Sequence, residues 1–241
     1  MKNLMQPIYK RILLKLSGEY LQGKKKLGID FFILNRIAVE IKELISMGVQ
    51  VGLVVGGGNL FRGYYLKKIG INKIIADQIG MLSTIINGLV VTDALRKIHS
   101  NVCLMSPIPI SNFCESYSYM KAISLLCNNY IVIFASGIGI PFFSTDSAAC
   151  IRGIEIKANI ILKATKVNGV YSKDPGKEPK AFFYEKISYE DILRKKLKVM
   201  DLTAFTIAKE HNLPIRIFNI DKLGALKKII LGGKEGTLIT K

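Results

Sequence analysis

Tryptophan is absent from this chain of 241 residues, and histidine and cysteine are scarce. The two histidines, His99 and His211, lie near the predicted ends of helices, where a cation suits the helix dipole. The four cysteines stand at positions 103, 114, 127 and 150, so no CxxC pair with metal-ligand spacing exists. We therefore predict no metal centre held directly by the protein and no histidine acid–base catalyst, and we expect reduced thiols in a cytoplasmic protein.

Acidic residues are also few: 18 Asp and Glu face 35 Lys and Arg, which leaves a formal charge of +17. A charge of this size is compatible with a basic nucleic-acid-binding protein. The lysines are scattered in short groups, however (24–26, 67–68, 195–196 and 227–228), and no RRM, KH or helix-turn-helix signature is found. We favour a solvated basic surface without a dedicated nucleic-acid site and keep nucleic-acid binding as an alternative.

Long hydrophobic runs are lacking as well. The N-terminal stretch MKNLMQPIYKR has no apolar signal core. The longest apolar stretch, 79–91, is interrupted by Ser83, Thr84 and Asn87. We therefore expect neither export nor a membrane-spanning segment.

Short apolar runs rich in Ile and Val are present and alternate with longer segments of helical spacing. Strands are predicted over 11–16, 49–55, 102–106, 130–136, 159–165 and 214–220, and helices over 30–48, 72–100, 118–129, 146–158, 188–195, 201–212 and 222–231. Continuous hydrophobicity is typical of strands that are covered on both faces. The pattern predicts an α/β fold with a mostly parallel central sheet sandwiched by helices, and a single domain, 1–241, whose two lobes share that sheet.

Four loops follow predicted strands at the edge where parallel sheets bind ligands: 15–18, 56–63, 136–146 and 163–175. The second loop, within VVGGGNLFRG, resembles a phosphate-binding P-loop but lacks the lysine that completes that motif. Glycines let backbone N–H groups approach an anion closely, and one such loop is weak support for a phosphate site. Three loops rich in glycine or small hydroxyl residues at one sheet edge are stronger support.

Four charged residues in or near these loops could serve phosphoryl transfer, which needs cations and amides along the path of the transferring group. Lys15 could reach a phosphate as a point charge, and the planar fork of Arg62 could grip one with two hydrogen bonds. Asp146 and Asp201 could hold a reactive lysine charged and oriented. Each residue also has an interpretation without a catalytic role. Lys15 could be an ordinary lysine at a strand end, Arg62 a surface arginine, and the two aspartates the N-caps of helices.

At this point the sequence closely resembles the bacterial UMP kinase (uridylate kinase) family of the amino acid kinase superfamily. The resemblance covers the whole chain and rests on YKRILLKLSGE, GGGNLFRG, PFFSTDSAACIRGIEI, LKATKVNGVYSKDP, LKVMDLTAF and EGTLIT, in this order. It implies a kinase that transfers the γ-phosphoryl group of ATP to UMP with Mg²⁺, giving UDP and ADP, as a cytoplasmic homohexamer in pyrimidine biosynthesis. Another kinase of the superfamily, with CMP, carbamate or an amino acid as its acceptor, stays an alternative.

The resemblance also implies roles for individual residues. The catalytic residues would be Lys15, Arg62, Asp146 and Asp201. ATP would be bound by Lys15, Leu16, Ser17, Gly18, Gly58, Arg62, Thr165, Tyr171 and Asp174. UMP would be bound by Gly57, Asp77, Ile138, Gly139, Ile140, Pro141, Phe142, Phe143, Ser144 and Thr145. No general base is needed because the acceptor phosphate is already anionic, and Mg²⁺ would arrive with ATP.

Two departures from the family pattern concern specificity and regulation. Ile138 and Ile140 occupy positions where the family usually has Thr and Asn, so we expect weaker rejection of CMP. At an interface where relatives are commonly activated by GTP, Thr92, Cys103 and Tyr130 stand at expected basic positions. The remaining candidates for an activator site are Arg96 and the loop residues Gly23, Lys24, Lys25, Lys26, Leu27 and Gly28. We expect weak or absent GTP activation and keep UTP as a candidate inhibitor.

Overall fold

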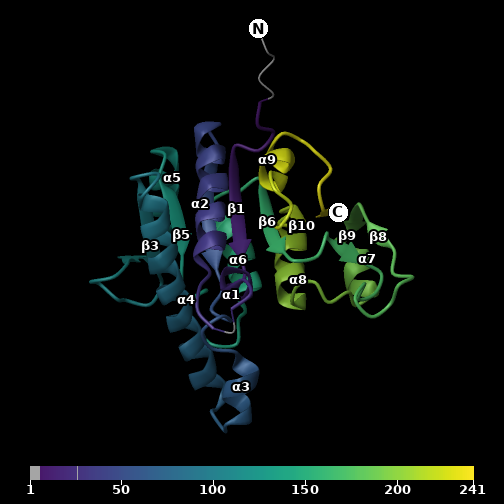
Figure 1. Cartoon of the computed structure of the whole chain (residues 1–241), viewed down its shortest axis with the longest axis horizontal. Helices are drawn as coiled ribbons and strands as arrows, with labels where there is room; N and C mark the ends of the chain where they lie inside the picture. The colour runs from purple at the N-terminus through teal and green to yellow at the C-terminus, as the bar shows by residue number, and fades with distance from the viewer. Residues whose placement is uncertain (1–5, 26) are drawn as a thin grey trace.

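One mixed sheet forms the centre of the molecule (Figure 1). The computed structural model describes residues 6–25 and 27–241. Within these residues the sheet has the order β4-β3-β5-β2-β1-β6-β10-β11-β9, and only the β10–β11 pair is antiparallel. Its strands are β1 (Arg11–Leu16), β2 (Gln50–Val55), β3 (Val102–Ser106), β4 (Glu115–Ser116), β5 (Ile131–Phe134), β6 (Ile160–Thr165), β9 (Lys186–Ser188), β10 (Ile215–Asn219) and β11 (Thr237–Thr240). A separate antiparallel hairpin joins β7 (Val170–Tyr171) to β8 (Phe183–Tyr184).

Helices cover both faces of the sheet, because the central strands alternate their buried side chains between two apolar cores. Leu14 belongs to the core beneath α1 (Gly18–Gln22), α2 (Phe31–Ser46), α4 (Lys73–Arg96) and α9 (Ala225–Ile230). Leu13 belongs to the opposite core, beneath α5 (Tyr119–Cys127), α6 (Thr145–Glu155), α7 (Tyr189–Arg194) and α8 (Leu202–Glu210). The predicted three-layer α/β fold is therefore confirmed, whereas the division into one domain with two lobes stays a prediction.

The predicted strands and longer helices are all present, with ends that differ by a few residues. Asp30 caps α2 as expected, since its side chain accepts hydrogen bonds from the N–H groups of Phe32 and Ile33. Two short helices were not predicted: α1, and α3 (Gly63–Lys68), which packs against the beginning of α4 (Figure 1). Helices of five or six residues are too short to display a hydrophobic period, so the sequence pattern does not indicate them.

Helix α4 is long and apolar enough to cross a membrane by length and composition. Its inner side, which includes Ile85 and Val91, is buried against β3, β5 and α2. Its apolar character is therefore that of a core helix. Leu82 and Ile86, by contrast, are about half exposed on its outer side.

Candidate active site

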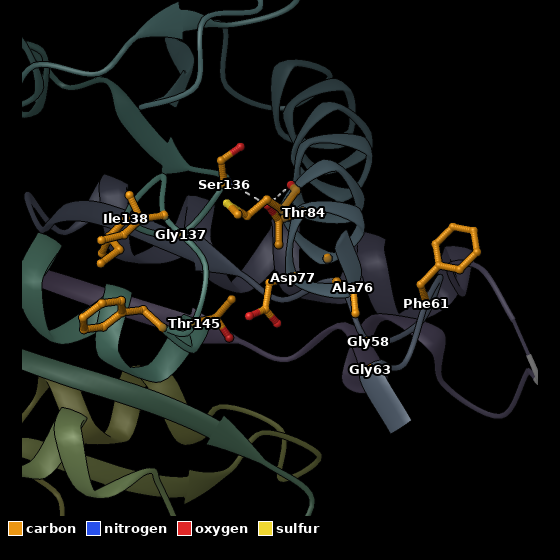
Figure 2. A pocket seen from close by; sticks show the side chains of 15 residues that line it. Gly58, Phe61, Gly63, Ala76, Asp77, Thr84, Ser136, Gly137, Ile138 and Thr145 are labelled. Carbon is orange, nitrogen blue, oxygen red and sulfur yellow. Dashed lines mark hydrogen bonds between the residues drawn. The ribbon is translucent and has the colours of Figure 1, made fainter. Parts of the chain in front are cut away.

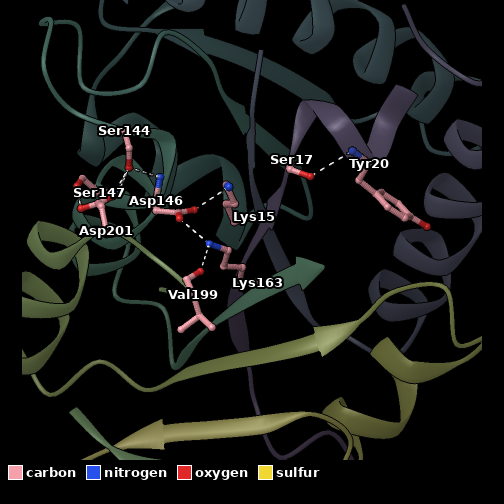
Figure 3. A network of polar contacts seen from close by, with 9 residues as sticks. All are labelled: Lys15, Ser17, Tyr20, Ser144, Asp146, Ser147, Lys163, Val199 and Asp201. Atoms are coloured by element: carbon pink, nitrogen blue, oxygen red, sulfur yellow. Dashed lines mark hydrogen bonds and ion pairs between the residues drawn. The ribbon is translucent and has the colours of Figure 1, made fainter. Parts of the chain in front are cut away.

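A buried cluster of two lysines and one aspartate lies at the carboxyl ends of the central strands (Figure 3). Lys15 on β1 and Lys163 on β6 are paired in register, so both side chains leave the sheet on the same face. Asp146, in the first turn of α6, lies between them. Its Oδ1 is 2.7 Å from Lys15 Nζ, and its Oδ2 is 2.5 Å from Lys163 Nζ.

These three side chains are largely withdrawn from water, with exposed fractions of 9% for Lys15, 13% for Asp146 and 12% for Lys163. Burial alone would raise the pKa of the Asp146 carboxyl, but the charges of Lys15 and Lys163 outweigh it and hold that pKa below its ordinary value. Burial lowers the pKa of Lys163, which Asp146 partly counteracts. With both lysines charged, the cluster carries one net positive charge at the carboxyl ends of the central strands, and this charge suits an anionic ligand.

Asp201 lies beside this cluster and joins two helices at their N-termini. Its Oδ1 accepts hydrogen bonds from the Ala204 N–H at 2.8 Å and from Ser147 Oγ at 2.9 Å, and Ser144 Oγ donates to its Oδ2. Asp201 is therefore the N-cap of α8, which confirms the capping role that the sequence suggested as an alternative. The same contacts tie α8 to the first turn of α6, next to Asp146.

The capping interpretation of Asp146 was wrong. Ser144 is the N-cap of α6, and its hydroxyl accepts from the N–H groups of Asp146 and Ser147 at 3.0 Å and 3.1 Å. Several adjacent residues of the sequence STDS can cap a helix, and the pattern does not choose among them. Because Ser144 takes this role, the Asp146 carboxylate is available to both lysines.

The triple-glycine turn after β2 packs against neighbouring backbone. A Cβ at Gly56 would lie 2.9 Å from the Gly18 nitrogen, and one at Gly57 would lie 2.8 Å from the Gly80 carbonyl oxygen of α4. A Cβ at Gly58 would meet only the Glu19 side chain, 3.7 Å from its Cγ, although the Gly58 nitrogen itself lies so close to Gly18 that a Cβ at Gly18 would be 2.6 Å from it. Arg62 reaches back to α1, where its Nη2 is 3.2 Å from Glu19 Oε1.

A cavity of about 160 Å³ lies between this turn, α4 and the loop after β5 (Figure 2). The predicted acceptor residues that line it are Gly57, Asp77, Ile138, Ile140, Phe143 and Thr145. Asp77 points into it and holds the loop: its Oδ2 accepts from the Phe142 N–H at 2.8 Å, and its Oδ1 is 2.5 Å from Lys73 Nζ. The structure thus brings most of the predicted acceptor residues around one space.

Residues 10–219 match the family model described as the amino acid kinase family. This chain belongs to that family. The uridylate kinases of Blochmanniella pennsylvanica and of Escherichia coli K12 are 62% and 58% identical to it over 236 residues, which are 98% of each chain compared. Among solved structures, the UMP kinase of Bacillus anthracis superposes with a TM-score of 0.94 at 40% identity, covering 96% of both chains. The UMP kinase of Ureaplasma parvum gives 0.92 at 36% identity, covering 96% of this chain and 99% of its own.

The residues predicted for the nucleoside end of ATP lie near the Lys163 side of the cluster, since Val199, whose carbonyl accepts from Lys163 Nζ, lines the same cavity as two of them. Tyr171 and Asp174 line a second cavity of about 510 Å³, together with several lysines. Tyr171 also packs edge-on against Phe183 of the hairpin, with ring centroids 5.4 Å apart. The Thr165 hydroxyl is used for backbone hydrogen bonds, since it lies 2.8 Å and 3.0 Å from the carbonyl oxygens of Val167 and Phe218.

The positions considered for GTP activation fall into two places. Thr92, Arg96, Cys103 and Tyr130 line a third cavity of about 520 Å³ beside β3. The loop that contains Gly28 instead contacts the glycine turn, where Asn59 exchanges backbone and side-chain hydrogen bonds with Gly28 at 3.2 Å and 2.9 Å. Lys26, a further predicted member of that loop, lies outside the described residues.

Sequence reasoning missed Lys163 and Ser147 among the polar residues of this site. Lys163 stands in the run IILKAT, where a single lysine between apolar residues looks like an interruption of the strand. A signal was available, because RILLKL, another predicted buried strand, also contains a lysine near its carboxyl end. Two lysines at matching positions of two buried strands indicate a shared counter-ion.

Proposed function

We propose that this chain is a UMP kinase, a nucleoside monophosphate kinase that transfers the γ-phosphoryl group of ATP to UMP. The observation that carries the proposal is the Lys15–Asp146–Lys163 cluster, which lies at the same sheet edge as the acceptor cavity and the cavity at Tyr171. Relatives with 58–62% identity over 98% of the chain bear the name uridylate kinase. The cluster fits a reaction in which negative charge crosses from one nucleotide to the other.

The reaction forms one P–O bond and breaks one. A phosphate oxygen of UMP attacks the γ-phosphorus of ATP, and the bond from that phosphorus to the bridging oxygen breaks, which leaves ADP and UDP. The attacking oxygen already carries negative charge, so no side chain has to remove a proton. Lys15 neutralises charge on the transferring group, while Asp146 keeps Lys15 and Lys163 in place, and alignment by the surrounding loops supplies the rest.

Magnesium fits this site as an ion that accompanies ATP. In the part of the chain that the structure describes, no three His, Cys, Asp or Glu side chains gather closely enough to hold a metal ion by themselves. Magnesium in kinases is commonly bound by substrate phosphates with one or two carboxylates. Asp146 and Asp201 are the carboxylates in place for this, and the ion would neutralise phosphate charge when bound.

The acceptor cavity leaves uracil recognition to the backbone. Ile138 and Ile140 line it and offer no donor or acceptor for the edge of the base. Its volume of about 160 Å³ is also smaller than the roughly 300–1,000 Å³ usual for ligand sites, so we expect the loop that Asp77 holds to move when UMP enters. A further cavity, of about 630 Å³, adjoins Asp77 and Ala76 on the side of α3.

An ADP-release assay with UMP, CMP and dUMP as acceptors tests the proposed function. We expect UMP to be the best acceptor, with a ratio of kcat/KM for UMP over CMP about ten-fold smaller than in a relative that has Thr and Asn at these positions. The double variant Ile138→Thr with Ile140→Asn should raise that ratio. No ADP release with UMP would refute the function, and a ratio as large as that of the relative would refute the specificity prediction.

GTP is expected to raise the rate less than two-fold at subsaturating ATP. The cavity beside β3 offers Arg96 and Lys121 as cations, while Thr92, Cys103 and Tyr130 are uncharged, so a triphosphate would be poorly neutralised there. Arg96 is partly committed as well, since its Nη2 donates to the Val102 carbonyl at 3.1 Å. Initial rates with and without GTP measure this, and a several-fold activation would contradict it.

We extend the proposal to assembly and cellular role, as the resemblance implies: a cytoplasmic homohexamer in pyrimidine nucleotide biosynthesis, with UTP as a candidate inhibitor. Exposed apolar side chains on neighbouring helices support association of copies. On α2 these are Phe31, Phe32 and Val39, and on α4 they are Leu82 and Ile86. Exposed apolar groups on two adjacent helices are typical of a surface that another subunit covers.

A further inference from the structure

Arg152 of α6 is a buried arginine that contacts the loop after β5 (135–144), which lines the acceptor cavity. Only 4% of it is exposed. Its Nη1 is 2.7 Å from Glu155 Oε2, and its Nη2 donates to the carbonyl of Gly137 at 3.2 Å. One guanidinium thus joins helix α6 to the loop that lines the acceptor cavity.

Tyr117 completes the surroundings of this guanidinium. The Arg152 Cζ lies 3.7 Å from the centre of the Tyr117 ring, close enough for a cation–π interaction, and the Tyr117 hydroxyl donates to the same oxygen of Glu155. The tyrosine is itself held, because its N–H donates to the Ser106 carbonyl at 2.9 Å and its ring packs edge-on against Phe134. The guanidinium plane is therefore fixed by a carboxylate on one side and an aromatic ring on the other.

The loop that Arg152 contacts has a backbone that needs support. Ser136, Gly137, Gly139 and Phe142 have φ angles of 56°, 58°, 90° and 74°, in the left-handed region. For Ser136 and Phe142 this conformation costs conformational energy, of order 1–3 kcal/mol for a non-glycine residue. Such a loop keeps one shape only when its polar groups are held from outside. The Ser136 N–H donates to Thr84 Oγ1 at 2.7 Å, the Ser136 carbonyl accepts from the Gly139 N–H at 3.0 Å, and the Gly137 carbonyl is held by Arg152.

The orientation of one peptide follows from this contact. In a trans peptide the C=O and N–H groups point in opposite directions. Because the Gly137 carbonyl points toward Arg152, the N–H of Ile138 points away from α6, and both residues line the acceptor cavity (Figure 2). Within residues 6–25 and 27–241 this N–H has no backbone partner. The Ile138 side chain has no hydrogen-bonding group, so this backbone N–H is the donor that Ile138 can offer to a ligand in the cavity.

We propose that Arg152 is a positioning residue for the acceptor base: it fixes the Gly137–Ile138 peptide so that the Ile138 N–H can donate to an acceptor atom of the base. The proposal rests on the proposed UMP kinase function. Arg152 does not touch the reacting atoms, so its removal should act on acceptor binding and selectivity, with little effect on ATP.

The variants Arg152→Lys and Tyr117→Phe test this proposal. Lysine keeps the charge but lacks the planar fork whose two nitrogens bond Glu155 and Gly137 in a fixed geometry, so we expect the KM for UMP to rise about ten-fold, the KM for ATP to stay within about two-fold, and kcat/KM for UMP over CMP to fall. Tyr117→Phe keeps the ring beneath the guanidinium and removes one hydrogen bond to Glu155. A smaller change in the same direction is expected.

Arg216→Lys is the matched control. Arg216 is also a buried arginine, 8% exposed, whose Nη1 donates to a backbone carbonyl, that of Glu235 at 3.0 Å, at the β10–β11 side of the sheet. It should change thermal stability without changing the ratio of the two KM values. Normal UMP turnover by the unmodified protein, with an unchanged KM ratio in Arg152→Lys, would overturn the proposal alone. No UMP turnover by the unmodified protein would overturn the proposed function and the proposal together.

Discussion

Replacing Lys15 by alanine is expected to lower kcat about a thousand-fold, with much smaller changes in the KM values for ATP and UMP. The lysine side chain is only 9% exposed and its Nζ lies 2.7 Å from Asp146 Oδ1, so its charge is fixed in place before substrates bind. A cation held in this way stabilises the transferring phosphoryl group without reorganisation, and losing one such group typically costs about 10²–10³ in rate or more. Steady-state kinetics with both substrates varied measures the effect.

Lys97→Ala is the matched control for this experiment. Lys97 also pairs with an aspartate, Asp93 at 2.8 Å, but it lies at the C-terminal end of α4 and 66% of its side chain is exposed. Its removal should leave the kinetics unchanged. The Lys15→Ala protein should still fold, because Asp146 keeps Lys163 at 2.5 Å. A folded Lys15→Ala protein with kcat within ten-fold of the unmodified enzyme would remove Lys15 from the mechanism.

The second large effect is expected for Asp146→Asn, which should reduce both activity and stability. Asparagine leaves the buried ammonium groups of Lys15 and Lys163 facing each other without a counter-ion. Breaking a buried ion pair on one side typically costs about 3–5 kcal/mol, which corresponds to a fall in Tm of roughly 10 °C for a chain of this size. We expect kcat to fall at least about a hundred-fold, because Lys15 loses its position.

The stability loss in Asp146→Asn should depend on pH in a defined direction. The native pKa of Asp146 is lowered from its ordinary 3.8, so the carboxylate contributes stability above that value and loses it as the pH falls through the lower native pKa. The difference between the unmodified protein and Asp146→Asn should therefore be large at neutral pH and shrink in strong acid. Asp93→Asn, at a surface pair whose aspartate is 69% exposed, is the control and should change the free energy of unfolding by less than about 1 kcal/mol. Equal unfolding free energies for the two variants at pH 7 would contradict this account of the cluster.

The strands and long helices could be predicted because burial on both faces leaves a direct mark on the sequence. RILLKL and IILKAT are nearly continuous apolar runs, and each became a central strand, β1 and β6. The antiparallel pairing of β11 with β10 and the pairing of β9 with β11 could not be predicted, since they depend on contacts between segments about 20 and about 50 residues apart. The pattern gives the elements, and long-range pairing decides their order.

Individual site residues could be predicted only where both the type of side chain and its position at the end of a strand or the start of a helix suit the same role. Lys15 and Asp146 were candidates because a lysine at a strand end and an acid at a helix start suit phosphate chemistry. Lys163 was not a candidate, because its role depends on its lying beside Lys15 on the neighbouring strand. The pairing of β1 with β6 and its register cannot be read from the sequence of one strand. The glycine turn was expected to serve ligands, whereas Gly56 and Gly57 also permit close packing against Gly18 and α4.

Transfer of label from [γ-³²P]ATP measures the central claim most directly. The protein is incubated with labelled ATP, magnesium and UMP, and the products are separated by chromatography. The account predicts radioactive UDP formed in equal amount to ADP, with Lys15→Ala forming about a thousand-fold less per unit time. Label that stays in ATP, or that is released only as inorganic phosphate, would contradict it.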